Sequence, residues 1–195
     1  MEENHLFPVF FKLEQLHVLV VGGGNIGHEK VSAMLQNCPG AHISVVATRF
    51  NEELEVMAKQ YNDVELIRKP FSCGDLFGKQ LVIAATNDKD LNYTVWEKAK
   101  ASKVLINVAD TPALCDFYLG SVVTKGNLKI AISTNGKSPT MAKRIKQILQ
   151  ESIPDGVNEL LDNLHRLRDR LKGDFAAKVK QLNEITAGLV EEDKK

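Results

Sequence analysis

The stretch HVLVVGGGNIGHEK, residues 17–30, carries the strongest fold signal in this chain. Apart from its first residue the run 17–21 is apolar, which is typical of a central parallel strand buried on both faces. The run ends in glycines, and the apolar spacing that follows predicts a helix from Asn25 to Asn37. The stretch therefore predicts a strand, a tight turn and a helix, which is the first half of a βαβ unit.

Strand and helix signals keep alternating downstream of this stretch. Apolar runs predict further strands over 42–47, 64–68, 80–86 and 104–109. Asn51 and Asp88 are good N-caps for helices that run to about Tyr61 and Ser102. Because the links are short, residues 1–112 are expected to form an α/β domain with a Rossmann-like, doubly wound parallel sheet.

The pattern changes after residue 112. The β-rich runs 118–124 and 128–134 flank Lys125-Gly126-Asn127 and predict a hairpin. Ser138 as N-cap and Pro139 as first residue predict a helix to about Ser152. Two amphipathic helices follow, and the apolar stripe of the second includes Leu189. Two helices cannot bury such stripes alone, so they must pack on the sheet domain, on the hairpin or on a second copy. We therefore expect a β-hairpin/helical dimerisation region (113–152) and a C-terminal helical region (153–195).

Composition excludes several classes of protein. The 195 residues carry 25 Lys and Arg and 25 Asp and Glu, so no nucleic-acid partner bound through bulk charge is expected. Three cysteines with no C-x-x-C suggest neither a disulfide framework nor a thiolate metal site, and no metal site is predicted. The start is too acidic for a signal peptide, and no apolar run is long enough to span a membrane. We expect a cytoplasmic location.

The glycine-rich turn fits the G-x-G-x-x-G pattern of a dinucleotide site. Gly22 permits the tight turn, Gly24 lets the backbone approach a pyrophosphate, and Gly27 allows close packing of helix on strand. The N–H groups at the helix start, at Asn25 and Ile26, face the anion. The sequence therefore predicts an NAD(P) site.

The ribose side of this predicted site lacks the usual acidic residue, which is expected about 20 positions further on. Thr48 stands there as a hydrogen-bonding candidate for the ribose. Arg49 is suited to a 2′-phosphate, and is equally consistent with a solvated loop cation. Thr86 ends the fourth strand among small residues, which leave room for a cofactor or serve packing.

A second group of candidate residues lies outside the glycine turn. Asp110 follows the fifth strand, at the edge of the sheet where ligands bind, as a general base or as the cap of a turn. Lys137 and Ser138 precede the helix that starts at Pro139, where an anion site is possible. Lys143 and Arg144 follow on that helix, although such cations usually form a solvated face.

Together these motifs resemble one family. The segments FPVFFKL, VVGGGNIGHEK, NVADTP, CDFYLGSVV and AISTNGKSPTMAKRIKQ occur in the order and at the spacing of precorrin-2 dehydrogenase, the dehydrogenase/ferrochelatase module of sirohaem synthase. The resemblance implies NAD-dependent oxidation of precorrin-2 to sirohydrochlorin. Some members also insert Fe²⁺ to give sirohaem. Members are typically homodimers formed through the hairpin and the C-terminal helices.

The resemblance also implies roles for single residues. The essential aspartate of the family falls on Asp110, and the serine of its G-x-S-P element, phosphorylated in some members, falls on Ser138. The cofactor contacts fall on Gly22 to Ile26 and near Thr48 and Arg49. The family commonly lacks the ribose carboxylate and uses NAD, which weakens the NADP interpretation. Gly27 departs from many relatives, which have Ala there.

The substrate that the resemblance implies carries eight carboxylates, for which Lys137, Lys143 and Arg144 are candidate partners. Asp110 is the candidate acceptor of the proton that leaves during oxidation, or a group that orients the ring. The alternative is an NAD(H)-binding regulatory module without catalysis. Regulators of that class usually keep the acidic ribose residue, which this chain lacks.

Overall fold

The computed structural model describes residues 4–187, and the chain divides into two compact units. The sheet unit holds the chain up to Gly120 together with Ser133–Pro139. The hairpin–helix unit holds Ser121–Ile132 and the chain from Thr140 onward. The division into three regions at residues 112 and 152 stays a prediction.

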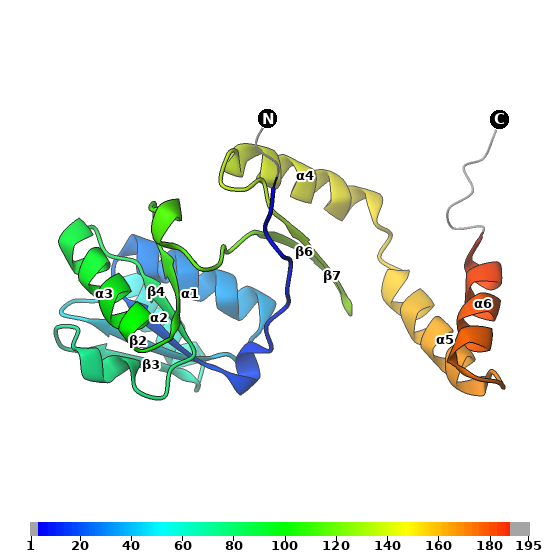
Figure 1. Ribbon diagram of the computed structural model, residues 1–195, viewed down its shortest axis with the longest axis horizontal. Coiled ribbons are helices and arrows are strands. Elements are labelled where there is room, and N and C mark those ends of the chain that lie inside the picture. The colour runs from blue at the N-terminus through cyan, green and yellow to red at the C-terminus, as the bar shows by residue number, and fades with distance from the viewer. Residues whose placement is uncertain (1–3, 188–195) are drawn as a thin grey trace. The chain divides into compact units, whose positions relative to one another are not determined.

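The sheet unit is a five-stranded parallel sheet with the strand order β3-β2-β1-β4-β5. Figure 1 shows this sheet with helices packed beside it. The strand order is the doubly wound one, in which the chain direction across the sheet reverses next to β1. The predicted Rossmann-like class is therefore confirmed. The strands are β1 (His17–Val21), β2 (His42–Ala47), β3 (Val64–Arg68), β4 (Leu81–Ala84) and β5 (Leu105–Val108).

Helices cover both faces of the sheet: α1 (Asn25–Asn37) and α2 (Glu52–Gln60) on one, α3 (Lys89–Ala101) on the other. Alternate residues of β1 point to opposite faces. Val18 and Val20 belong to the apolar cluster beneath α1 and α2, and Leu19 and Val21 to the cluster beneath α3. All four are buried, which confirms the strand predicted to be buried on both faces.

The predicted element bounds are mostly confirmed. Asn51 caps α2 by accepting a hydrogen bond from Leu54 N–H at 3.0 Å, and Asp88 caps α3. β4 and β5 end earlier than predicted, at Ala84 and Val108, because the chain turns into loops there. Three short 3₁₀ turns were not predicted, namely Leu13–Gln15, Cys73–Leu76 and Pro112–Leu114.

The hairpin–helix unit begins with the predicted hairpin. Its elements are β6 (Ser121–Lys125), β7 (Leu128–Ile132), α4 (Pro139–Ser152), α5 (Val157–Arg170) and α6 (Phe175–Thr186). The two strands pair antiparallel, and α4 starts at Pro139 as predicted. Asp174 caps α6 by accepting from Ala177 N–H at 2.9 Å. Leu189, expected on the apolar stripe of this helix, lies outside the described residues.

The tip of the hairpin is bound to the start of α5. Asn127 N–H donates to Asn158 Oδ1 at 2.8 Å, and Lys125 forms an ion pair with Asp155. Gly126 has φ 56°, and a Cβ there would lie 2.3 Å from the same Asn158 oxygen. The hairpin turn and α5 are therefore fitted to each other at a glycine.

Within residues 4–187, no helix has both the length and the apolar character needed to cross a bilayer. The predicted cytoplasmic location stays a prediction. No group of three His, Cys, Asp or Glu side chains in that range is arranged to hold a metal ion. The three cysteines are free, and burial raises the pKa of the Cys115 thiol, as does the charge of Asp116.

Candidate functional site

The glycine turn between β1 and α1 leaves no room for a side chain at three of its positions, Gly22, Gly23 and Gly27. Gly22 has φ 126°, and a Cβ there would lie 2.3 Å from Ala85 O. A Cβ at Gly27 would lie 2.1 Å from Gly22 O. The start of α1 is therefore packed directly on the backbone of β1 and of the chain after β4, as the motif predicts.

Gly24 is the exposed position of the same turn. A Cβ at Gly24 would meet nothing within 4 Å. Gly24 is the N-cap position of α1, and it has no side chain that could accept a hydrogen bond. The backbone N–H groups of Asn25, Ile26 and Gly27 therefore have no acceptor within residues 4–187. An open glycine beside free N–H groups at the positive end of a helix fits the diphosphate of a dinucleotide.

The loop after β2 packs on this turn from the side. A Cβ at Gly23 would lie 2.6 Å from the Phe50 ring, and Asn51 N–H donates to Gly23 O at 2.8 Å. The guanidinium of Arg68 covers the Phe50 ring, 5.2 Å from its centroid. These contacts fix the loop that carries Thr48 and Arg49 beside the glycine turn.

Thr48 and Arg49 are both exposed in this loop. Across the described part of the chain, Arg49 forms no ion pair and no side-chain hydrogen bond. A free guanidinium beside a dinucleotide site is available to a ribose or a phosphate. The exposed Arg49 side chain is equally consistent with a solvated cation. A cofactor role for Arg49 therefore stays a prediction.

Thr86 lies at the carboxyl end of β4, half-buried, and its hydroxyl is engaged within the loop. Thr86 Oγ1 lies 2.7 Å from Asn92 Oδ1 and accepts from Asp88 N–H at 3.2 Å. Asn92 Nδ2 donates back to Thr86 O at 3.0 Å. These hydrogen bonds show that Thr86 stabilises the loop after β4. The predicted contact of Thr86 with a cofactor stays a prediction.

Asp110 follows β5 and has the left-handed backbone conformation, with φ 56°. Asp tolerates this conformation better than most residues. Its side chain is exposed, and its carboxylate has no hydrogen-bond or ion-pair partner among residues 4–187, so it caps no turn there. Ala109 N–H pairs with Ala84 O at 2.9 Å, which holds Asp110 at the carboxyl edge of the sheet that also carries the glycine turn.

The second predicted group is divided between the two units. Lys137 and Ser138 belong to the sheet unit, in a turn where Thr134 Oγ1 accepts from Ser138 N–H at 3.2 Å. Lys143 and Arg144 are exposed on α4, in the hairpin–helix unit. Lys137, Lys143 and Arg144 form no ion pair with any described carboxylate. All three cations are therefore available to an anionic ligand.

Sequence reasoning missed two asparagines that organise the site. Asn51 was predicted only as a helix cap, yet its side chain also reaches Asn25, 26 positions earlier in the chain. Asn92 is buried within α3 and holds the loop at Thr86. The position of Asn51 directly after the ribose loop was a usable signal, whereas nothing in the sequence around Asn92 indicates its partner.

Comparisons with known proteins match this chain along most of its length. A family model described as "Putative NAD(P)-binding" matches residues 9–121, and one described as "Sirohaem biosynthesis protein central" matches residues 125–152. A solved structure named SirC, precorrin-2 dehydrogenase, is 30% identical with a TM-score of 0.74, covering 92% of this chain and 89% of that one.

Curated relatives carry the name siroheme synthase. That of Pseudoalteromonas translucida is 38% identical over 174 residues, which are 89% of this chain and 34% of the relative. That of Psychrobacter arcticus is 36% identical over 176 residues, 90% of this chain and 31% of the relative. The chain thus spans about a third of the length of these curated relatives.

Proposed function

This chain belongs to the precorrin-2 dehydrogenase family, and from that premise we propose that it oxidises precorrin-2 to sirohydrochlorin with NAD⁺. The observation that carries the proposal is the position of Asp110. Its carboxylate is exposed and unpaired within residues 4–187, at the same sheet edge as the glycine turn. A proton acceptor and a dinucleotide site are the two parts that such an oxidation requires.

The residues of the glycine turn would hold the cofactor. Backbone N–H groups at Asn25 and Ile26 bind the diphosphate, Gly24 leaves it space, and Thr48 and Arg49 lie on the ribose side. When bound, NAD⁺ supplies the hydride acceptor. The missing ribose carboxylate is usual for the family, so it does not count against NAD.

Asp110 would accept the proton that the substrate loses. Its carboxylate has no hydrogen-bond or ion-pair partner among residues 4–187, which leaves it available as a base. The left-handed backbone at this residue directs the chain away from β5 directly after the strand. A second role for Asp110 is to accept a pyrrole N–H proton if Fe²⁺ enters the macrocycle as a second substrate.

Cations and a hydroxyl would bind the carboxylates of the tetrapyrrole. Lys137, Lys143 and Arg144 have no carboxylate partner among the described residues, and Ser138 lies directly before α4. Charge-assisted hydrogen bonds to carboxylates are the strongest polar contacts that such side chains form. A net charge of zero is compatible with individual cations that bind an anionic ligand.

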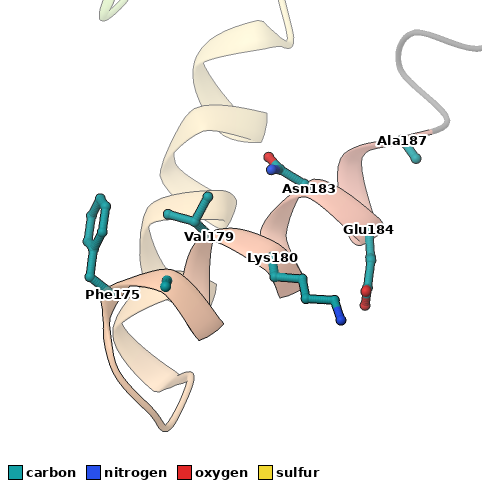
Figure 2. A pocket seen from close by; sticks show the side chains of 7 residues that line it. Phe175, Val179, Lys180, Asn183, Glu184 and Ala187 are labelled. Carbon is teal, nitrogen blue, oxygen red and sulfur yellow. The ribbon is translucent and has the colours of Figure 1, made fainter.

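We also propose that the chain forms a homodimer through the hairpin–helix unit. Helices α5 and α6 have no buried residue, and Phe175 is 82% exposed. Phe175 and Val179 line the same shallow groove along α6 (Figure 2). An amphipathic helix pair with such a face is stabilised by a second copy. The molar mass in solution, measured by light scattering, tests this.

The test of the catalytic proposal is spectroscopic. Purified protein mixed with precorrin-2 and NAD⁺ is expected to give the absorbance of sirohydrochlorin together with that of NADH. Asp110→Asn keeps a residue that tolerates the left-handed backbone but removes the base, and we expect it to abolish turnover while NAD⁺ binding persists. Asp63→Asn, which removes an exposed carboxylate at the opposite sheet edge, is the matched control.

Three outcomes are informative. Loss of NAD⁺ binding in Asp110→Asn would show that Asp110 serves the cofactor and not the proton transfer. Binding of NAD⁺ without turnover of precorrin-2 by the unmodified protein would favour the alternative, a regulatory NAD(H)-binding module. Incubation with sirohydrochlorin and Fe²⁺ without NAD⁺, followed by absorbance, tests metal insertion separately.

A further inference from the structure

Asn51 lies where α2 and the glycine turn meet the loop of Thr48 and Arg49. It forms three hydrogen bonds, one each through its backbone N–H, its Oδ1 and its Nδ2. Its backbone N–H donates to Gly23 O at 2.8 Å. Its Oδ1 accepts from Leu54 N–H at 3.0 Å, which caps α2. Its Nδ2 donates to Asn25 Oδ1 at 3.1 Å. The first bond holds the loop on the glycine turn and the second caps α2, whereas the third joins two side chains.

The third bond fixes the orientation of the Asn25 amide. A side-chain amide has one oxygen that accepts and one nitrogen that donates two hydrogens. Because Asn51 occupies the oxygen, Asn25 offers its NH₂ group to its remaining surroundings. That nitrogen has no acceptor within residues 4–187, and Asn25 is exposed as the first residue of α1.

We infer that Asn51 is a positioning residue, which turns the Asn25 amide so that its NH₂ donates to the diphosphate of the dinucleotide. Side-chain donors then add to the backbone N–H groups of the glycine turn at the positive end of α1. Without Asn51 Nδ2, the Asn25 amide rotates freely and its oxygen, which repels an anion, faces the site part of the time. This inference rests on the dinucleotide binding in the proposed function.

The variant Asn51→Ser separates positioning from folding. Serine is as good an N-cap as asparagine and keeps the backbone N–H that bonds Gly23, but it has no amide donor for Asn25. We expect its melting temperature to match that of the parent protein. Its Kd for NAD⁺ and for ADP, measured by calorimetry, should each rise about threefold to tenfold, as expected for one hydrogen bond.

Two further variants make the test specific. Asn25→Ala removes the amide itself, so adding Asn51→Ser to it should leave the Kd for NAD⁺ unchanged. Asp174→Ser exchanges the cap of α6 in the hairpin–helix unit and is the control for capping alone. We expect this control to bind NAD⁺ as the parent does. In turnover, Asn51→Ser should raise KM for NAD⁺ more than it lowers kcat.

The inference is overturned if Asn51→Ser binds NAD⁺ and ADP with the parent's affinity. It is also overturned if the loss caused by Asn51→Ser persists in the Asn25→Ala background, because the effect then bypasses the amide. A parent protein that binds NAD⁺ but leaves precorrin-2 unchanged contradicts the proposed reaction. The inference about Asn51 is then still decided by the Kd values of the variants for NAD⁺ and ADP. A parent protein that does not bind NAD⁺ overturns both.

Discussion

The two units of this chain bury apolar surface very differently. In the sheet unit, every residue of β1 after His17 is buried, and helices pack on both faces of the sheet. In the described part of the hairpin–helix unit, only Val123 and Ala142 are buried apolar residues. The first unit therefore carries its own core, while the second has amphipathic helices whose apolar stripes still need a covering surface.

Glycine serves the two units differently as well. In the sheet unit, a Cβ at Gly22 would meet backbone atoms, which cannot move aside. In the hairpin–helix unit, a Cβ at Gly126 would meet the side chain of Asn158, which can rotate away. The phosphate turn is thus a rigid feature and the hairpin joint an adaptable one, and four predictions test this difference.

The largest effect is expected for Gly22→Ala. The substitution combines a left-handed backbone with a clash against Ala85 O, and we expect it to lower the free energy of unfolding by about 4 kcal/mol. Gly24→Ala is the control, because its Cβ meets no atom, and it should keep the parent's stability while weakening NAD⁺ binding. Urea denaturation measures the free energy of unfolding, and calorimetry measures the affinity for NAD⁺. A stable Gly22→Ala protein would contradict the rigid turn.

The second prediction compares two leucines. Leu19 is fully buried in β1, and Leu19→Ala should cost about 3 kcal/mol of unfolding free energy. Leu164 is only half-buried on α5, so Leu164→Ala should cost less than about 1 kcal/mol in the separate chain. Urea denaturation at low protein concentration measures both. In a homodimer, Leu164→Ala should instead make the transition depend more strongly on concentration. An equal loss of unfolding free energy in Leu19→Ala and Leu164→Ala would contradict the difference in burial between the two units.

The third prediction concerns the hairpin joint. Asn158→Ala removes the acceptor for Asn127 N–H and should lower the unfolding free energy by about 1 kcal/mol. Asn163→Ala, on the exposed side of the same helix, is the matched control and should be nearly silent. Thermal unfolding followed by circular dichroism measures the difference. A large loss, similar to that of Leu19→Ala, would show that the joint is as rigid as the phosphate turn.

The smallest effects are expected from two carboxylates. Burial acts to raise the pKa of Asp75, but hydrogen bonds from Lys69 and Ser72 outweigh it, so the pKa lies below its ordinary value. The Lys125 ammonium likewise lowers the pKa of Asp155, which is fully exposed. A lowered folded-state pKa stabilises the protein above the unfolded-state value, near pH 4, and this stabilisation is lost as the pH falls through the folded-state pKa.

The melting temperature measured from about pH 6 to about pH 2 tests both carboxylates. Asp75→Asn should flatten this profile and lower the melting temperature at neutral pH. Asp155→Asn should change it less, and the change should disappear in high salt because an exposed ion pair is screened. A larger effect of Asp155→Asn than of Asp75→Asn would contradict this ranking of the two units.

Local signals predicted most of this fold. The helix α1, the strands β1 to β3 and the caps Asn51 and Asp88 lie where the sequence places them, because apolar spacing and capping depend on residues within one or two turns of each other. The ends of β4 and β5 were less predictable. Each strand stops where its loop begins, and the loops are set by Asn92 and by the backbone at Asp110.

The candidate site was predictable in part. The glycines of the turn can be recognised in the sequence, because their spacing follows from the steric demands of a phosphate site. The partner of Asn51 could not be predicted, because Asn25 lies 26 positions earlier and meets it only in the folded sheet unit. Thr86 and Asn92 are six positions apart, but no sequence signal marks their hydrogen bond. No periodicity in the chain marks such a contact.

The class of fold, the dinucleotide turn and its place between β1 and α1 could be predicted from the residues alone, because they follow from backbone sterics and short-range hydrogen bonds. The folded structure was needed to show that Gly23 packs on the loop after β2, that Asp110 lacks a partner within residues 4–187, and that Asn51 holds the Asn25 amide. Those properties depend on which atoms approach through space, and residues 26 positions apart meet only when the sheet has formed.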